Sequence, residues 1–70
     1  MEIVFTKHAK DQMKDRKILE IWVEETIKSP DKTEREGEKY YIIKKLNGKI
    51  LKVVYLKKRY IKVLTTFFIT

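Results

Sequence analysis

Three polar side chains with different chemistry stand four residues apart near the start of the chain: His8, Gln12 and Arg16. Thr6 is a residue type that caps helix N-termini, and on a helix beginning there these three side chains stack along one flank. Histidine has an unperturbed pKa of about 6.5 and can transfer protons near neutral pH, whereas arginine holds phosphate oxygens with a planar guanidinium fork. The row could therefore bind or cleave a phosphodiester, or it could equally close the edge of a small core.

Metal-independent cleavage of RNA needs a base for the 2′-hydroxyl, an acid for the 5′-oxygen and cations that hold the phosphate. In that interpretation His8 transfers a proton and Arg16 braces the phosphate, so these two residues are the catalytic candidates. Binding to nucleic acid would use further cations, an amide and an aromatic ring that stacks on a base. The candidate nucleic-acid-binding residues are Gln12, Arg35, Lys39, Tyr41, Lys52, Arg59 and Lys62.

The 70 residues, of which 43% are hydrophobic and 39% charged, are typical of one soluble globular domain spanning residues 1–70. The chain has no cysteine and one histidine, which argues against disulfides and against zinc sites built from protein ligands. Neither a metal nor another cofactor is expected. No apolar run approaches the ~20 residues of a membrane helix, and the first residues do not read as a signal peptide. A cytoplasmic protein without a membrane partner is expected.

Charge is distributed unevenly along the chain. Residues 1–36 contain eight Lys or Arg and nine Asp or Glu, a net charge of −1, whereas residues 37–70 contain nine Lys or Arg and only Glu38 as an acid, a net charge of +8. The sum is the overall charge of +7. A cationic half of this kind suggests a surface that faces a polyanion such as RNA, although lysine also serves solubility and protects strand edges.

A short strand and two helices are expected in the first half of the chain. Residues 2–5 read as the strand, and Ala9 and Met13 fall one turn apart on an inward stripe of the first helix. A second helix over residues 19–28 ends at the Ser-Pro-Asp sequence 29–31, and because the connection is short we expect an antiparallel helical hairpin. The inward arc of the second helix is predicted to contain Leu19, Trp22, Val23, Thr26 and Ile27, with Ile21 on the polar side.

The second half of the chain is expected to form a sheet. Strands over residues 39–46 and 49–56 flank Asn47-Gly48, a pair that favours a two-residue type I′ turn. A short edge strand over residues 32–35 and a last strand over 60–69 complete the sheet. The turn predicts four cross-strand pairs, namely Leu46 with Lys49, Lys44 with Leu51, Ile42 with Val53 and Tyr40 with Tyr55.

The register of the last strand depends on the basic turn Lys57-Lys58-Arg59. A three-residue turn places Ile61, Val63 and Thr65 on the face shared by Ile42 and Val53, whereas a two-residue turn flips the strand. The opposite face would then carry several lysines and Tyr41. The expected fold class is α+β, with an N-terminal helical hairpin packed on one face of an antiparallel β-sheet.

The sequence also resembles a known family. The run F-T-K-H-A-K-D-Q-M-K-D-R-K-I, a helix ending in S-P-D and a last strand containing I-K-V-L-T-T-F are similar to a small family of domains of unknown function. Its pattern is roughly aromatic-[ST]-x-H-A-x-x-R-M-x-x-R-x-I, followed by P-D and a closing V-V-T strand. Gln12 stands where this family usually has arginine, and Leu19 where it usually has a serine or threonine cap. The matching residues are His8, Ala9, Met13, Arg16, Ile18, Pro30, Asp31 and Thr65.

That family is grouped with RelE/ParE-like toxins, within the small ribonuclease-like folds that include barnase and colicin nucleases. The resemblance covers nearly the whole chain and implies a RelE/ParE-like fold and an RNA-directed function. One hypothesis is a toxin-like, metal-independent ribonuclease of the mRNA interferase type that uses His8. The alternatives are a non-catalytic nucleic-acid-binding module, which the loss of a cation at Gln12 favours, and a protein-interaction module of a toxin–antitoxin type system. RNA, an antitoxin protein and a second copy of the chain are the corresponding partners, the last through the strand edge at Phe67 to Thr70.

Overall fold

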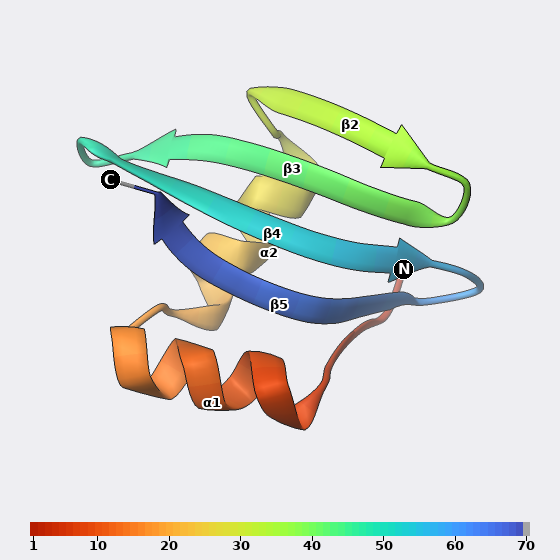
Figure 1. Ribbon diagram of the computed structural model, residues 1–70, viewed down its shortest axis with the longest axis horizontal. Coiled ribbons are helices and arrows are strands. Elements are labelled where there is room, and N and C mark those ends of the chain that lie inside the picture. Colours follow the sequence, from red (N-terminus) through yellow and green to blue (C-terminus); the bar gives the residue numbers. More distant parts are fainter. Residues whose placement is uncertain (70) are drawn as a thin grey trace.

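The computed structural model describes residues 1–69, and these form an α+β fold of two helices and one five-stranded sheet. The strand order across the sheet is β1-β5-β4-β3-β2, so the first and last strands of the chain are neighbours (Figure 1). In chain order the elements are β1 (Ile3–Phe5), α1 (Lys7–Arg16), α2 (Glu20–Lys28), β2 (Lys32–Glu36), β3 (Lys39–Leu46), β4 (Lys49–Lys57) and β5 (Ile61–Ile69).

The sheet is mixed, which corrects the expectation of a wholly antiparallel one. Strands β2 to β5 pair antiparallel with their neighbours, but β1 pairs parallel with β5 from Ile3 opposite Ile61 to Phe5 opposite Val63. A parallel pair needs a long crossover connection, and here nearly the whole chain lies between the two strands. The parallel pair places the N-terminal strand at one edge of the sheet.

The β3–β4 hairpin has the register that its turn residues predict. Asn47 and Gly48 both have positive φ angles, 49° and 81°, as a type I′ turn requires. Because that turn closes the hairpin directly, all of the cross-strand pairs predicted from it are present, including Ile42 opposite Val53 and Tyr40 opposite Tyr55. This hairpin forms the middle of the sheet.

Strand β5 contains a bulge that changes which residues face the core. Tyr55 pairs with Val63, but the preceding residue of β4, Val54, pairs with Thr65, so Leu64 has no partner across the two strands. An extra residue in one strand reverses the side-chain alternation beyond it. The prediction that Thr65 faces the core is therefore wrong, because Thr66 takes that place and is fully buried.

The two helices begin and end as their sequences indicate. The Thr6 side chain accepts a hydrogen bond from the Ala9 amide at 3.1 Å, and α1 ends at Lys17 in the left-handed conformation with φ of 56°. Leu19 precedes α2 as its N-cap, with extended backbone, and its side chain is 53% exposed. The prediction that Leu19 belongs to the buried arc is therefore wrong, because it lies outside the helix. Ile21 is exposed, as expected.

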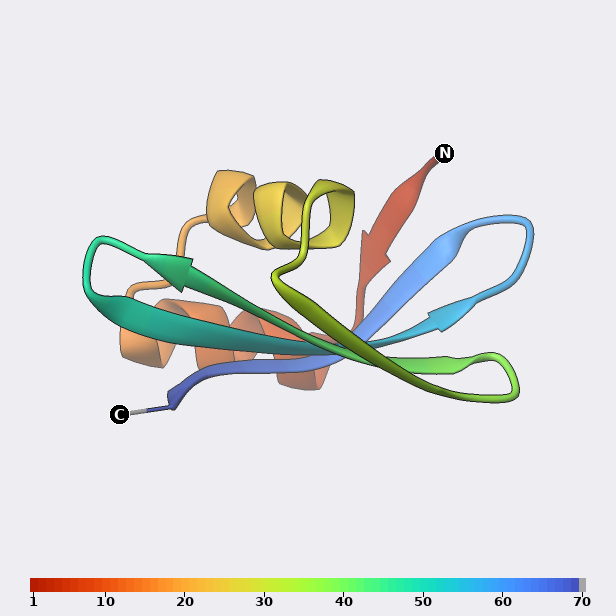
Figure 2. The same ribbon diagram turned by 90° about the horizontal axis from the view of Figure 1, so that it is seen from above.

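The helices occupy different parts of the sheet. Helix α2 packs across β3 and β4, whereas α1 follows β5 and β1 (Figures 1 and 2). Figure 2 shows α2 on one side of the sheet, and Figure 1 shows that it runs obliquely to α1 behind β3 and β4. Both helices add side chains to one core, but α1 packs on β5 and β1 while α2 packs on β3 and β4, so the expected antiparallel helical hairpin is not formed.

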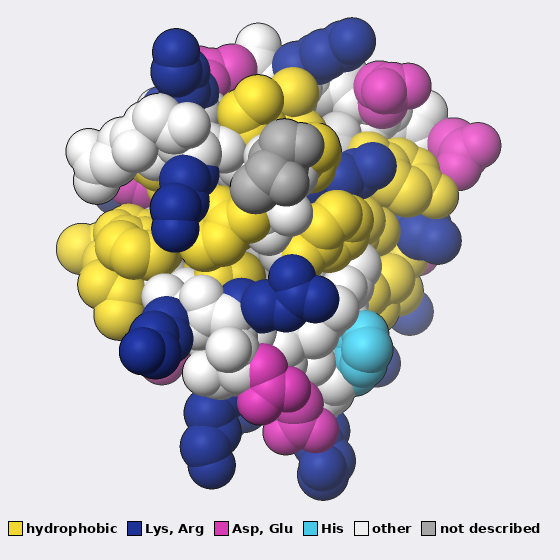
Figure 3. All heavy atoms as spheres, turned by 60° about the vertical axis from the view of Figure 1, so that its left-hand side comes forward, with side chains coloured by type: hydrophobic (Ala, Val, Ile, Leu, Met, Phe, Trp, Pro, Cys, Tyr) yellow, Lys and Arg dark blue, Asp and Glu magenta, His cyan; other side chains and the backbone are white. Residues whose placement is uncertain are grey.

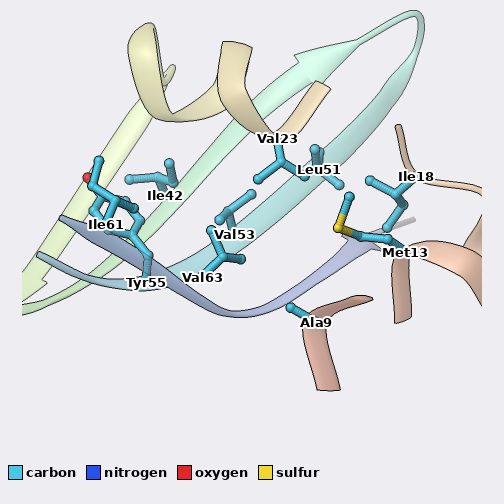
Figure 4. Close-up of a cluster of buried hydrophobic side chains, with 10 residues drawn as sticks. All are labelled: Ala9, Met13, Ile18, Val23, Ile42, Leu51, Val53, Tyr55, Ile61 and Val63. Carbon is cyan, nitrogen blue, oxygen red and sulfur yellow. The ribbon is translucent and has the colours of Figure 1, made fainter. Parts of the chain in front are cut away.

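The core lies between the helices and one face of the sheet. Val23 of α2 is fully buried and points toward Leu51 of β4, and Ala9 of α1 is fully buried beside Val63 (Figure 4). Trp22 and Ile27 are half-buried and pack against this cluster. The predicted burial of Ala9, Met13 and Val23 against the sheet is thereby confirmed, whereas Leu19 is exposed and Trp22 and Ile27 are buried only in part. The buried cluster consists of Ala9, Met13, Ile18, Val23, Ile42, Leu51, Val53, Tyr55, Ile61 and Val63.

Candidate nucleic-acid interface

The face of the sheet opposite the core carries no helix in the described chain (Figure 2). We call it the open face. Its side chains alternate with those of the core along each strand, so strand register places them in rows across β3, β4 and β5. The rows are Lys39–Leu56–Lys62, Tyr41–Val54–Thr65, Ile43–Lys52–Phe67 and Lys45–Ile50–Ile69.

Tyr41 stands in the middle of β3 on the open face, with the ammonium groups of two lysines near its ring. The Lys39 Nζ lies 5.3 Å from the ring centroid and the Lys52 Nζ lies 5.8 Å from it. The Tyr41 hydroxyl donates a hydrogen bond to the Glu36 carboxylate at 3.0 Å, which fixes the ring against the edge strand β2. An aromatic ring with two ammonium groups near it can stack on a base while the lysines contact the adjoining phosphates.

The open face is cationic and partly apolar. The four rows contain four lysines and no acid. The edge strand β2 adds Lys32, Glu34 and Glu36 to this face, opposite Ile43, Tyr41 and Lys39. Hydrophobic side chains lie between the lysines, and Ile50 and Ile69 are 36% and 38% exposed. Figure 3, which looks toward the end of the sheet where β5 ends, shows blue Lys and Arg side chains interspersed with yellow hydrophobic ones, with magenta acids at the top, the upper right and the bottom of the view. This mixture of cations and ring surface suits a single strand of nucleic acid.

The predicted row on α1 is divided between two roles. Gln12 is half-buried, and its Oε1 accepts hydrogen bonds from the Thr66 amide at 3.1 Å and from the Thr65 hydroxyl. The amide side chain therefore closes the edge of β5 rather than facing a ligand. His8 and Arg16 are exposed, and neither makes an ion pair or side-chain hydrogen bond within residues 1–69.

The other predicted binding residues do not gather at one place. Lys39, Tyr41, Lys52 and Lys62 share the open face. Arg35 pairs with Tyr40, so it belongs to the opposite face of the sheet; its Nε donates a hydrogen bond to the Gly37 carbonyl at 2.8 Å. Arg59 lies exposed in the turn between β4 and β5. Lys45 is also on the open face, as the strand alternation predicted, and so is Phe67, which the predicted register did not place there.

On the covered face, Tyr40 and Tyr55 stack with ring centroids 5.0 Å apart and planes 3° apart. Burial raises the pKa of Tyr55, and the neighbouring Tyr40 raises it further. The stacked rings join β3 to β4 on the face opposite the open face.

Residues 1–69 bring together no group of three or more His, Cys, Asp or Glu side chains placed to hold a metal ion. No helix among these residues is long and apolar enough to cross a membrane.

Residues 5–68 match a family described as a domain of unknown function, DUF4258. The chain belongs to the DUF4258 family. The match begins at the last residue of β1 and ends one residue before the end of β5, so it includes both helices, the α1 row and all of the open-face rows except Ile69. No curated protein and no solved structure matches the chain. The DUF4258 description carries no activity, and the grouping with RelE/ParE-like toxins stays a hypothesis.

Proposed function

We propose that this DUF4258 domain is a toxin-like, RNA-directed protein that binds single-stranded RNA on its open face. The observation that carries the proposal is the Tyr41 ring on a sheet face without a helix, with the ammonium groups of Lys39 and Lys52 at 5.3 Å and 5.8 Å from its centroid. Every base has a ring face that can stack on Tyr41, and the lysines would neutralise phosphates on either side. This is the non-catalytic binding function among the hypotheses drawn from the sequence.

Charge also favours a polyanion over a second copy of the chain on this surface. Two open faces packed together would bring the lysines of both copies into contact, with only Glu34 and Glu36 of each β2 strand to offset them. Like charges across an interface oppose association. A single nucleic-acid strand supplies negative charge along its length and releases its counterions on binding.

The test replaces Lys39, Lys52 and Lys62 together by glutamine and measures binding to single-stranded RNA over a range of salt concentrations. The slope of log K against log salt should flatten by about 0.7 for each lost phosphate contact, so by about 2 for the triple variant. A matched variant with Lys10, Lys14 and Lys58 replaced by glutamine removes the same charge from exposed positions off the open face. If both triple variants change the slope equally, binding is not located on the open face.

Tyr41→Ala tests the stacking contribution separately. Loss of one base–aromatic contact should weaken binding by about 1–3 kcal/mol with an unchanged salt slope. Tyr41→Phe keeps the ring and should retain most of the affinity, even though it loses the hydrogen bond to Glu36. Equal binding by wild type and Tyr41→Ala would remove the stacking role.

RNA cleavage that uses His8 is the second candidate function. The observation that favours it is that the His8 ring is exposed and makes no hydrogen bond or ion pair within residues 1–69, which leaves it available to a substrate. Arg16 is also exposed, but eight residues along a helix correspond to about 12 Å along its axis. We therefore propose that Arg16 would hold a neighbouring phosphate rather than the one attacked near His8.

His8→Ala separates catalysis from binding. If His8 is a general acid or base, the variant should bind RNA normally but lose about 10²- to 10⁴-fold in a metal-independent cleavage rate. Cleavage that persists in His8→Ala, or that stops when a chelator is added, would contradict the histidine mechanism. If wild type does not cleave RNA, either free or with ribosomes present, the function is binding alone.

A protein partner, either an antitoxin or a second copy of the chain, completes the proposal for a cytoplasmic toxin–antitoxin type system. Exposed Ile50 and Ile69 form the apolar end of the open face, where such a partner would dock. Sedimentation at increasing protein concentration tests self-association through this end. An Ile50→Lys variant should abolish any dimer formed there, and a dimer that survives it uses another surface.

A further inference from the structure

A separate pocket of about 350 Å³ lies at the other side of the sheet, where the hairpin turn meets the junction of α1 and α2. Its floor is apolar: Trp22, Leu46 and Phe68 line it. The rings of Trp22 and Phe68 lie 6.2 Å apart between centroids and are tilted by 59°, so they present an aromatic corner. Phe68 pairs with Leu51 of the core, which places the pocket on the covered face and away from the open face.

Three cations stand at the rim of this pocket: Arg16, Lys17 and Lys49. All three are exposed, no acid lines the pocket, and none of them forms an ion pair within residues 1–69. The Lys49 Nζ already lies 5.0 Å from the centroid of the Phe68 ring, so a positive charge is held at the aromatic surface. Lys17, at the C-terminal end of α1, has a left-handed backbone conformation that glycine adopts with less strain than lysine does.

The chemistry of floor and rim together specifies a ligand with a planar ring and more than one negative charge. A pocket of this volume is at the small end of the range for small-molecule sites. A singly charged aromatic carboxylate would leave most of the rim charge unneutralised, whereas a phosphate monoester carries about −1.5 to −2 at neutral pH. The Asn47 amide, also at the pocket, can donate and accept hydrogen bonds at the edge of a base.

We propose that this pocket binds a nucleotide, with its base against Trp22 and Phe68 and its phosphate at Arg16, Lys17 and Lys49. The site does not use the open face, so the inference does not rest on RNA binding there. Arg16 is the one residue that it shares with the candidate cleavage function. The nucleotide is either free or the 5′-phosphorylated end of an RNA strand, since both present the same chemistry.

Trp22 is the only tryptophan of the chain, so its fluorescence reports directly on the pocket. Titration with adenosine 5′-monophosphate should change Trp22 emission saturably, and adenosine or inorganic phosphate should bind at least about tenfold more weakly. Replacing Lys17 and Lys49 by glutamine should weaken binding of the mononucleotide by about tenfold, the combined effect of two exposed charge contacts. The matched variant, with Lys10 and Lys58 replaced by glutamine, should bind as wild type does.

Short RNAs with and without a 5′-phosphate distinguish the two sources of the nucleotide. A preference for the phosphorylated RNA assigns the pocket to a strand end, and equal weak binding of both assigns it to the free mononucleotide. Amide chemical shifts show which surface responds: the inference requires changes at Trp22, Asn47 and Lys49, and changes confined to Tyr41 and Lys52 overturn it while leaving the open-face proposal intact. Unchanged Trp22 emission at millimolar mononucleotide, or equal affinity for adenosine, also overturns it.

Discussion

Gln12 offers the sharpest test of how this small fold is held together. Its Oε1 accepts hydrogen bonds from the Thr66 amide and the Thr65 hydroxyl. Both lie in the second half of β5, beyond the residues that pair with the edge strand β1. Gln12→Met keeps the length and helix propensity of the side chain but removes the acceptor. Thr66 is fully buried, so its amide would be left without a partner, whereas the half-buried Thr65 hydroxyl can turn to water.

An unpaired buried amide costs about 1–3 kcal/mol, and we therefore expect Gln12→Met to lose about 2 kcal/mol of unfolding free energy. For a domain of this size each kcal/mol corresponds to about 4–8 °C, so the melting temperature should fall by about 8–16 °C. Total stability of a chain this long is of the order of 3–10 kcal/mol, which makes the effect easy to measure in urea.

Two controls make the Gln12 experiment decisive. Gln12→Glu retains an acceptor in the same place and should keep most of the stability, and Lys14→Met places the same new side chain at an exposed position of α1. If Gln12 instead binds RNA, as its place in the α1 row first suggested, Gln12→Met would weaken RNA binding and leave the melting temperature unchanged. That result would refute the reasoning from the β5 edge.

Three further predictions concern the core, the turn and pH. Thr66→Val should raise the free energy of unfolding in urea by about 1 kcal/mol, because the buried Thr66 hydroxyl has no hydrogen-bond partner. Thr26→Val is the control and should bring no such gain, since the Thr26 hydroxyl donates to the Trp22 carbonyl at 2.8 Å. Gly48→Ala should cost about 1–2 kcal/mol of unfolding free energy from its φ of 81° alone, as no atom lies within 4 Å of the added carbon; a larger loss would point to a steric clash. The pKa of Tyr55 is raised in the folded protein, so as pH rises the unfolded chain loses the Tyr55 proton first. The free energy of unfolding should therefore fall as pH rises above 10.0, the ordinary pKa of tyrosine, toward the pKa of Tyr55 in the folded state. In thermal melts Tyr55→Phe should make that fall shallower than Tyr60→Phe does.

Local signals in the sequence were sufficient for most of the fold. The Asn47-Gly48 turn determined the register of β3 and β4 because positive φ at both residues admits one hairpin geometry. Thr6 and the spacing of Ala9 and Met13 were enough for α1 and its buried stripe. These features depend on neighbours in the sequence, so a single chain reveals them.

The features that sequence reasoning missed depend on distant contacts. The bulge at Leu64 places Thr65 outside the core and Phe67 on the open face. Nothing in the alternation of polar and apolar residues over 60–69 indicates the position of a bulge. The parallel pairing of β1 with β5, and the use of Gln12 to close that edge, follow from tertiary geometry. The candidate site was therefore predicted at Lys39, Tyr41, Lys52 and Lys62 but not as a complete surface.

The position of β5 makes the domain mechanically asymmetric. Its first residues are bonded to β1 on one side and β4 on the other, and α1 holds its second half through Gln12, whereas β1 is a three-residue edge strand. A force applied at the N-terminal end peels away β1 by breaking a few bonds in turn. The same force at the C-terminal end must draw out β5, which is bonded to β4 along its length and to β1 at its start, and must disrupt the core as well. A protein-unfolding motor that threads this chain should therefore advance more readily from its N-terminal side.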